Sequence, residues 1–171
     1  TTVTDGEEVV LGGRTWVSLH TPGHTHDHLC LYDPADGILL SGDHVLPTIT
    51  PHIGGIGPMD DPLATFFHSL ERMKELPGLR QVLPAHGHPF TDVAGRVDDI
   101  ISHHGERLDT IRKAGDHLGS GTVEEYMKRL FKERSWGDMA ASETYAHLEH
   151  LRIMGQAKRD ETAGQAIYST S

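Results

Sequence analysis

The sequence predicts an α+β protein with a β-rich first part, residues 1–95, and a mostly helical second part, residues 96–171. In the first part, short apolar runs typical of strands alternate with loops rich in Gly, Pro and Asp. After about residue 95, apolar residues recur at the spacing of three or four that indicates helices. The chain of 171 residues is long enough for one domain, or for one and a half small domains.

Five apolar runs of the first part are predicted to be strands. The runs EEVVLGG and RTWVSLH occupy residues 7–20 and meet at a Gly12-Gly13 turn. The run HLCLYD places Leu29 and Leu31 on one face, which predicts a half-buried strand. The runs ILLSGD and RQVLPAHG each begin as a buried strand and end in a loop of small residues.

Residues 45–60 contain three prolines and three glycines, which predicts a long irregular loop of the kind that often carries function. Asp60 or Asp61 next to Pro62 predicts the start of a helix, because Asp caps helices and Pro suits their first position. This helix is expected to end at Pro77-Gly78. Its apolar face consists of Leu63, Phe66, Phe67, Leu70 and Met73.

The second part is predicted to contain three helices followed by a β-hairpin. The first helix has an apolar face from Val97 to Ile111 and breaks at a Gly-Ser-Gly sequence. Thr122 and Glu125 have the spacing of a capping box, which opens the second helix. The third helix covers roughly residues 142–154, and the hairpin turns at ETAG. Three helices and a hairpin, in this order, are typical of a small winged-helix module.

Charge and cysteine content limit the kind of partner and compartment. Residues 1–95 hold 4 Lys and Arg against 12 Asp and Glu, a net charge of −8, whereas residues 96–171 carry −2. An acidic first part argues against a general phosphate-binding surface but is compatible with a cation site. Cys30 is the one cysteine and fits a reducing cytoplasm, where we expect it to be a buried or rim thiol and not a nucleophile. No apolar run is long enough for a membrane span, so no membrane partner is expected.

Histidine is unusually frequent, with 14 in the chain, and three short motifs place a His or an Asp directly after a predicted strand. These motifs are TPGHT with His24, SGD with Asp43 and PAHG with His86. Gly permits unusual backbone angles and close approach, and Pro fixes the direction of the chain. Each motif alone is a common turn, but all three in this order predict ligands gathered from separate loops at one metal site.

The same three motifs resemble the last three metal motifs of the metallo-β-lactamase superfamily. The resemblance implies that residues 1–95 form the C-terminal half of that family's αββα sandwich, followed by the winged-helix module. It implies that His24 binds one metal and His86 the other, with Asp43 bridging the two. Such a pair of metals lowers the pKa of a shared water and supplies a hydroxide nucleophile. Zinc, two per full-length chain, suits the N and O ligands, with iron or manganese as alternatives.

The longer segments GDHVLPTITPHIG and HHGERL resemble the branch of this superfamily that includes glyoxalase II-like and endoribonuclease-like hydrolases with a C-terminal winged helix. This resemblance covers nearly the whole chain and implies hydrolysis of a small-molecule ester or thioester. Asp43 stands where true β-lactamases have Cys, which argues against that activity. His26 and His52 stand where the branch often has Asp and Asn, and both would alter the edge of the pocket.

One family motif is missing. The first metal motif, His-x-His-x-Asp-His, does not occur in the sequence, and Thr1 stands where an initiator methionine would be. We therefore expect a fragment of a longer protein, with the general base in an N-terminal half that these residues do not include. The fragment alone is expected to be inactive. It is also expected to pair with its other half or to self-associate, because an open sheet face would expose roughly several hundred Å² of apolar surface, which monomers avoid.

Several further residues are candidates for a role near the site. His44 and His52 lie on the loop after Asp43 and are expected to face the substrate. His28 and Asp27 either orient His24 or hydrogen-bond within their own turn.

Three functions therefore remain open for the full-length protein. The first is metal-dependent hydrolysis of an ester or thioester, and the second is a metal-dependent phosphodiesterase acting on RNA. The third is a non-catalytic binding module in which the winged helix contacts nucleic acid or a protein. The third helix carries Glu143 and Glu149 against Arg152, which disfavours a nucleic-acid partner. The charges of this helix favour a packing role for the module against the hydrolase core or a second subunit, and His104, on an apolar helix face, is expected to be an interface histidine.

Overall fold

The computed structural model describes residues 2–162 and 164–170. Within this range the chain divides into two compact units. The first unit comprises the chain up to Pro51 together with Thr65–Ile101, and the second comprises His52–Ala64 and the chain from Ser102 onward. Among the described residues, no helix combines the length and the apolar character that crossing a membrane requires.

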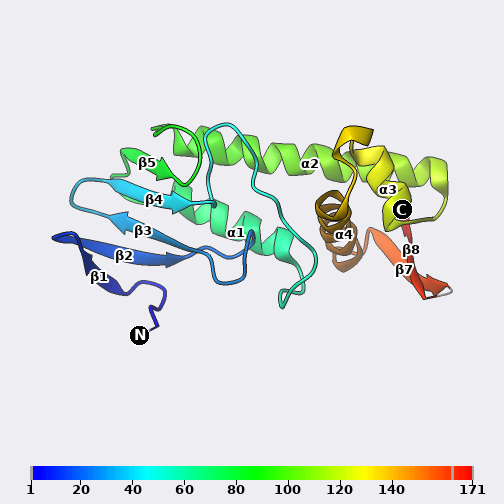
Figure 1. Cartoon of the computed structure of the whole chain (residues 1–171), viewed down its shortest axis with the longest axis horizontal. Helices are drawn as coiled ribbons and strands as arrows, with labels where there is room; N and C mark the ends of the chain where they lie inside the picture. The colour runs from blue at the N-terminus through cyan, green and yellow to red at the C-terminus, as the bar shows by residue number, and fades with distance from the viewer. Residues whose placement is uncertain (1, 163, 171) are drawn as a thin grey trace. The chain divides into compact units, whose positions relative to one another are not determined.

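The first unit is built on a five-stranded sheet in the order β1-β2-β3-β4-β5 (Figure 1). The first four strands pair antiparallel, and β4 pairs parallel with β5. The strands are β1 (Glu8–Leu11), β2 (Arg14–His20), β3 (Leu29–Asp33), β4 (Ile38–Gly42) and β5 (Gln81–Pro84). All five predicted strands are confirmed. The helix α1 (Pro62–Lys74) begins at the predicted proline, and α2 (Val93–Leu118) follows β5.

One face of this sheet forms the core of the unit, and on β3 it is the face opposite Leu29 and Leu31. Along β3, Cys30 and Tyr32 are buried, whereas Leu29 is 37% exposed and Leu31 is half-buried. The hydroxyl of Tyr32 donates to the carbonyl of Pro77, just beyond α1, so the helix covers the Cys30 side. The half-buried strand predicted for this run is therefore present, but hydrophobicity alone does not tell which of its two apolar faces a helix covers.

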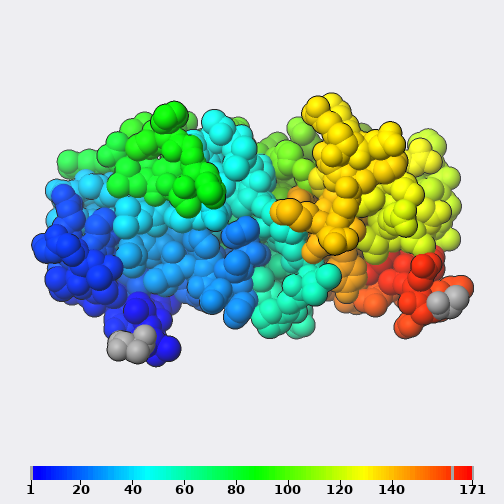
Figure 2. Space-filling view, viewed as in Figure 1, coloured from blue at the N-terminus to red at the C-terminus, as the bar shows by residue number. Residues whose placement is uncertain are grey.

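The second unit consists of the C-terminal part of α2, two further α-helices and a three-stranded sheet in the order β6-β8-β7. Its elements are β6 (Gly121–Thr122), α3 (Val123–Leu130), a 3₁₀ turn η1 (Glu133–Ser135), α4 (Asp138–Ile153), β7 (Ala157–Thr162) and β8 (Gln165–Thr170). The predicted capping box at Thr122 and Glu125 is confirmed, with both reciprocal hydrogen bonds formed. The two paired strands of the hairpin are confirmed too, whereas residue 163 of the predicted turn lies outside the described residues. The strand β7 lies at the surface of its unit, exposed after Ala157 (Figure 2).

Two features of the second unit were not predicted. The Gly-Ser-Gly break contains the start of β6, which pairs with β8 at Gly121 and Thr122. The loop segment 52–64 belongs to this unit, although it lies far from the rest of it in sequence. Gly55 donates its N–H to the carbonyl of Ser142 at 3.1 Å, and Asp61 Oδ2 lies 2.9 Å from Nδ1 of His150. These contacts with α4 hold the segment, and the boundary expected at residues 95–96 falls inside α2.

Candidate metal site

The three predicted ligands come together at one end of the strands of the first unit. Nε2 of His24 lies 3.9 Å from Oδ2 of Asp43, and Nε2 of His86 lies 3.4 Å from Oδ1 of the same carboxylate. Each carboxylate oxygen therefore faces a different imidazole.

The exposure of these side chains fits an open site. The side chain of His86 is 67% exposed, that of Asp43 is 33% exposed and that of His24 is 26% exposed. Within residues 2–162 and 164–170, Oδ1 of Asp43 is a buried acceptor that receives no hydrogen bond. A buried carboxylate oxygen without a donor is costly unless a cation compensates it. The nitrogen and oxygen donors present here therefore fit a divalent metal such as zinc.

Glycine permits the sharp turn before the first ligand. Gly23 has φ +141°, and a Cβ added to it would lie 2.4 Å from Cβ of Phe66 on α1. The turn is held against this helix by the hydroxyl of Ser69, which donates to the carbonyl of Pro22. Only glycine allows the chain to pass this close to α1 and still present His24.

A second histidine holds the turn that carries Asp43. The backbone N–H of Asp43 donates to Nε2 of His28 at 3.1 Å, so the hydrogen of the neutral ring is on Nδ1. That nitrogen lies 2.7 Å from Oγ1 of Thr21 and donates to it. Burial, and then the neighbouring His24, lower the pKa of His28, which keeps the ring neutral. Of the two roles expected for His28, the structure shows the hydrogen bonding within its own turn, through Thr21, and the ring in addition holds the backbone of Asp43.

The contact between His28 and Asp43 joins the first two motifs. Gly42 has φ +52°, and a Cβ there would lie 2.7 Å from Nε2 of His28. Glycine before the aspartate is thus needed for the ring to reach the backbone. The spacing of TPGHTHDH and SGD in the sequence could not show this contact, because it depends on the register between β2, β3 and β4. The side chain of Asp27, the other residue expected to orient His24 or to bond within the turn, is 76% exposed, and its Oδ1 lies 3.9 Å from Nδ1 of His26.

His44 is not at the surface. Its side chain is fully buried, and its ring lies edge-on to Phe66 with 5.3 Å between ring centroids. Burial lowers its pKa to about 3, so the ring is neutral. The expectation that His44 faces the substrate is corrected by this placement, because the backbone turn after Asp43 directs the side chain into the core beside α1.

His52 lies in the second unit, where Nδ1 is 3.2 Å from Oε2 of Glu143 on α4. Its side chain is 25% exposed. A role next to the substrate stays a prediction for this residue.

Cys30 is fully buried, as expected, and its Sγ lies 3.3 Å from Oγ1 of Thr21. Burial raises the pKa of the thiol from 9.0 to about 12. We therefore expect about 1000-fold less thiolate than for an exposed cysteine at pH 8, and very slow labelling by iodoacetamide. Mass spectrometry should show unlabelled native protein and full labelling in guanidinium chloride. Fast labelling of the native chain would contradict this assignment.

Comparison with known proteins agrees with the strand-end motifs. Residues 1–86 match the family model described as Metallo-beta-lactamase superfamily. The chain belongs to the metallo-β-lactamase superfamily. The resemblance inferred from the three motifs is thereby confirmed, as is the mixed α+β class.

The chain is similar to parts of several longer proteins, among them two relatives and one protein of known crystal structure. A hydroxyacylglutathione hydrolase from Idiomarina loihiensis is 40% identical over 93 residues, which cover 54% of this chain and 34% of that protein. An atrochrysone carboxyl ACP thioesterase from Aspergillus novofumigatus is 28% identical over 142 residues, covering 77% of this chain and 42% of that protein. The crystal structure of a metallo-beta-lactamase family protein from Thermus thermophilus is 33% identical, with a TM-score of 0.88. It is matched over 99% of this chain and 54% of its own. The chain thus spans about half, or less, of the proteins it matches.

Proposed function

We propose that the chain supplies half of a dinuclear metal site in a hydrolase that cleaves thioesters. The observation that carries this proposal is the orientation of Asp43, whose two carboxylate oxygens face Nε2 of His24 at 3.9 Å and Nε2 of His86 at 3.4 Å. In this proposal His24 holds one metal, His86 holds the other, and Asp43 bridges them. The chemistry that two zinc ions, or iron or manganese, supply when bound is activation of a water for attack on the thioester carbonyl.

The other residues near the site then act by fixing the position of the proposed metal ligands. His28 fixes the backbone of Asp43 through the 3.1 Å hydrogen bond, and Thr21 fixes the ring of His28. Loss of a group that orients a metal ligand in this way typically lowers metal affinity or activity by about 10- to 100-fold. The general base that manages the proton of the water is proposed to come from the other half of the protein.

The thioester as substrate class is supported by the relatives. One is named as a hydroxyacylglutathione hydrolase and another as an ACP thioesterase. Both leaving groups are thiols, so the shared chemistry is attack on a thioester carbonyl. The acidic net charge of residues 1–95 also disfavours a polyanionic substrate such as RNA.

An N-terminal half that packs on the first unit is supported by the second face of its sheet. On that face Leu31 and Leu40 lie directly opposite each other on β3 and β4. They and Leu83 are half-buried, and Leu29 is 37% exposed. A row of aliphatic side chains in this state is typical of a sheet that another layer covers. We propose that the missing layer is the other half of the family's sandwich.

The second unit has the element order of a winged helix. In this proposal α2, α3 and α4 are its helices, β6 is its first strand and β7–β8 is its wing. The pairing of β6 with β8 supports this assignment. A packing role for the module is favoured over nucleic-acid binding, because Glu149 of α4 is already paired with Arg152 and the helix offers few cations.

The test compares the 171-residue chain with a parent protein in which the proposed N-terminal half precedes it. The parent should contain two metals and hydrolyse an acylglutathione thioester, and His86→Ala should lower kcat/KM by more than about 100-fold, since loss of a ligand exceeds loss of a group that orients one. His88→Ala, an exposed neighbour in the same loop, should have little effect. The chain alone should be inactive. Thioester hydrolysis by the chain alone, or a fully active His86→Ala parent, would contradict the half-site.

A further inference from the structure

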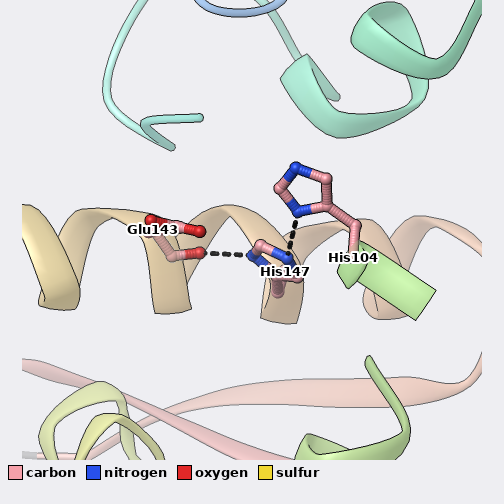
Figure 3. Close-up of side chains that lie close together, drawn as sticks. All are labelled: His104, Glu143 and His147. Carbon is pink, nitrogen blue, oxygen red and sulfur yellow. Dashed lines mark hydrogen bonds between the residues drawn. The ribbon is translucent and has the colours of Figure 1, made fainter. Parts of the chain in front are cut away.

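Three side chains of ligand type lie together in the interior of the second unit. They are His104 of α2 and Glu143 and His147 of α4, and all three are buried (Figure 3). One ligand atom from each lies within 4.8 Å of the ligand atoms of the other two. Glu143 and His147 are four residues apart, which places them one above the other on the same face of α4.

The two imidazoles already point ring nitrogens at each other. Nδ1 of His104 lies 3.0 Å from Nε2 of His147. The other nitrogen of His147, Nδ1, donates to the backbone carbonyl of Glu143 at 2.7 Å. Nε2 of His147 therefore carries a lone pair directed at His104. A hydrogen bond from the far nitrogen to a carbonyl is the usual way in which a metal-binding histidine is oriented.

Both rings are in the protonation state that metals require. Burial lowers the pKa of His104 to about 2 and that of His147 to about 4. At neutral pH both imidazoles are uncharged, so a metal need not displace a proton from an imidazolium ion. When the hydrogen between the two rings moves to Nε2 of His104, both facing nitrogens present lone pairs.

We propose that His104, Glu143 and His147 form a site for a single divalent transition metal, zinc foremost. Two imidazoles and one carboxylate are a common zinc ligand set, in which water supplies the fourth ligand. Ligand atoms around tetrahedral zinc are about 3.3 Å apart, given bonds of about 2.0–2.1 Å. The two histidines are close to this separation, and a rotation of the Glu143 side chain would complete it. The site is distinct from that of His24, Asp43 and His86, which belong to the first unit.

Two groups compete with a metal for the carboxylate. Oε1 of Glu143 accepts from the guanidinium of Arg107, and Oε2 lies 3.2 Å from Nδ1 of His52. A metal would take over one of these oxygens, and the nearby Arg107 cation opposes its charge. The proposal therefore predicts that removing the charge of Arg107 raises the affinity for the metal. A purely structural role of these three side chains would not give this effect.

The experiment uses the whole 171-residue chain with His24→Ala and His86→Ala, so that the first site cannot bind. Equilibrium dialysis with Zn²⁺ should give one metal per chain, and Co²⁺ should give the intense visible absorption of a tetrahedral site. His104→Gln or His147→Gln should weaken binding by more than about 100-fold, since each removes a direct ligand. His117→Gln is the matched control, because His117 lies exposed on the same helix α2. It should bind metal as the background does.

Other results would overturn the site. If the background chain binds no metal, the proposed site does not exist. If His104→Gln and His147→Gln still bind the metal, the binding belongs to other residues of the chain. Should neither glutamine variant fold, the background chain still decides, because a weak octahedral Co²⁺ spectrum contradicts a site with two imidazoles and one carboxylate. Thermal unfolding gives a second measurement. Zn²⁺ should raise the Tm of the background and of His117→Gln but not that of the two ligand variants.

Discussion

Replacing Gly23 by alanine is expected to destabilise the protein by about 2–6 kcal/mol, the sum of a steric and a backbone cost. An added Cβ would lie 2.4 Å from Cβ and 2.6 Å from Cα of Phe66. The Cα belongs to the backbone of α1 and cannot turn aside, so the loop or the helix must move, at a cost of about 1–3 kcal/mol. The φ of +141° adds strain for a residue with a side chain, of about 1–3 kcal/mol. Urea denaturation monitored by circular dichroism measures the change.

Gly12→Ala is the matched control for this prediction. Gly12 also has positive φ, at +59°, but no atom of the described residues lies within 4 Å of an added Cβ. Its substitution should therefore cost only the backbone strain, about 1 kcal/mol. Equal losses in the two variants would show that the contact with Phe66 does not restrict the loop. Because His24 follows directly, a displaced Gly23 should also move the first proposed ligand away from Asp43.

The proximity of the three proposed strand-end ligands could be predicted from the sequence because its signal is local. An apolar run followed by Gly or Pro and then by His or Asp marks a strand that ends in a turned loop, and in the structure His24, Asp43 and His86 of these loops lie close together. Helix starts were equally local, as Pro62 and the capping box of Thr122 show. These features depend on residues within a few positions of one another.

The features that could not be predicted depend on contacts between distant segments. The sequence does not show that α1 covers the Cys30 side of β3 and not the Leu31 side. It does not show that His44 turns inward to Phe66. Nor does it show that His147 of α4 faces His104, 43 residues earlier in the chain. A single histidine on a helix can have many roles, so neither His104 nor His147 indicates a metal site by itself. Only the tertiary packing of α2 and α4 brings the two rings together.

Arg107→Met is expected to destabilise the metal-free protein by about 3–5 kcal/mol. Glu143 is 8% exposed, and its carboxylate pairs with the Arg107 guanidinium. Burial raises the pKa of Glu143, but the hydrogen bond to His52 and the Arg107 cation outweigh it and keep the carboxylate ionised. Removing Arg107 takes away the cation that pairs with this buried carboxylate, which is the source of this cost. Part of the loss also comes from the contact of the guanidinium with the Phe131 ring, 4.6 Å from its centroid.

Two further variants separate these causes. Lys128→Met removes an exposed partner of Glu124 at i,i+4 spacing, so it should cost no more than about 0.5 kcal/mol. The double variant Arg107→Met with Glu143→Leu should regain most of the loss, since replacing both members of a buried pair is often neutral. If the double variant is no more stable than Arg107→Met, the loss arises from packing against Phe131 and not from the unpaired carboxylate.

Zinc should distinguish Arg107→Met from the double variant in a further way. In Arg107→Met the carboxylate of Glu143 has lost its competing cation, so its Oε1 no longer pairs with the guanidinium and can bind the metal. Chemical denaturation with and without Zn²⁺ should therefore show a larger zinc-dependent stabilisation in Arg107→Met than in the unsubstituted chain, because a ligand that binds only the folded state stabilises it more the higher its affinity. The double variant lacks the carboxylate and should gain less. An equal gain in all three proteins would place the metal away from Glu143, and the carboxylate would then serve only as the partner of Arg107 and His52.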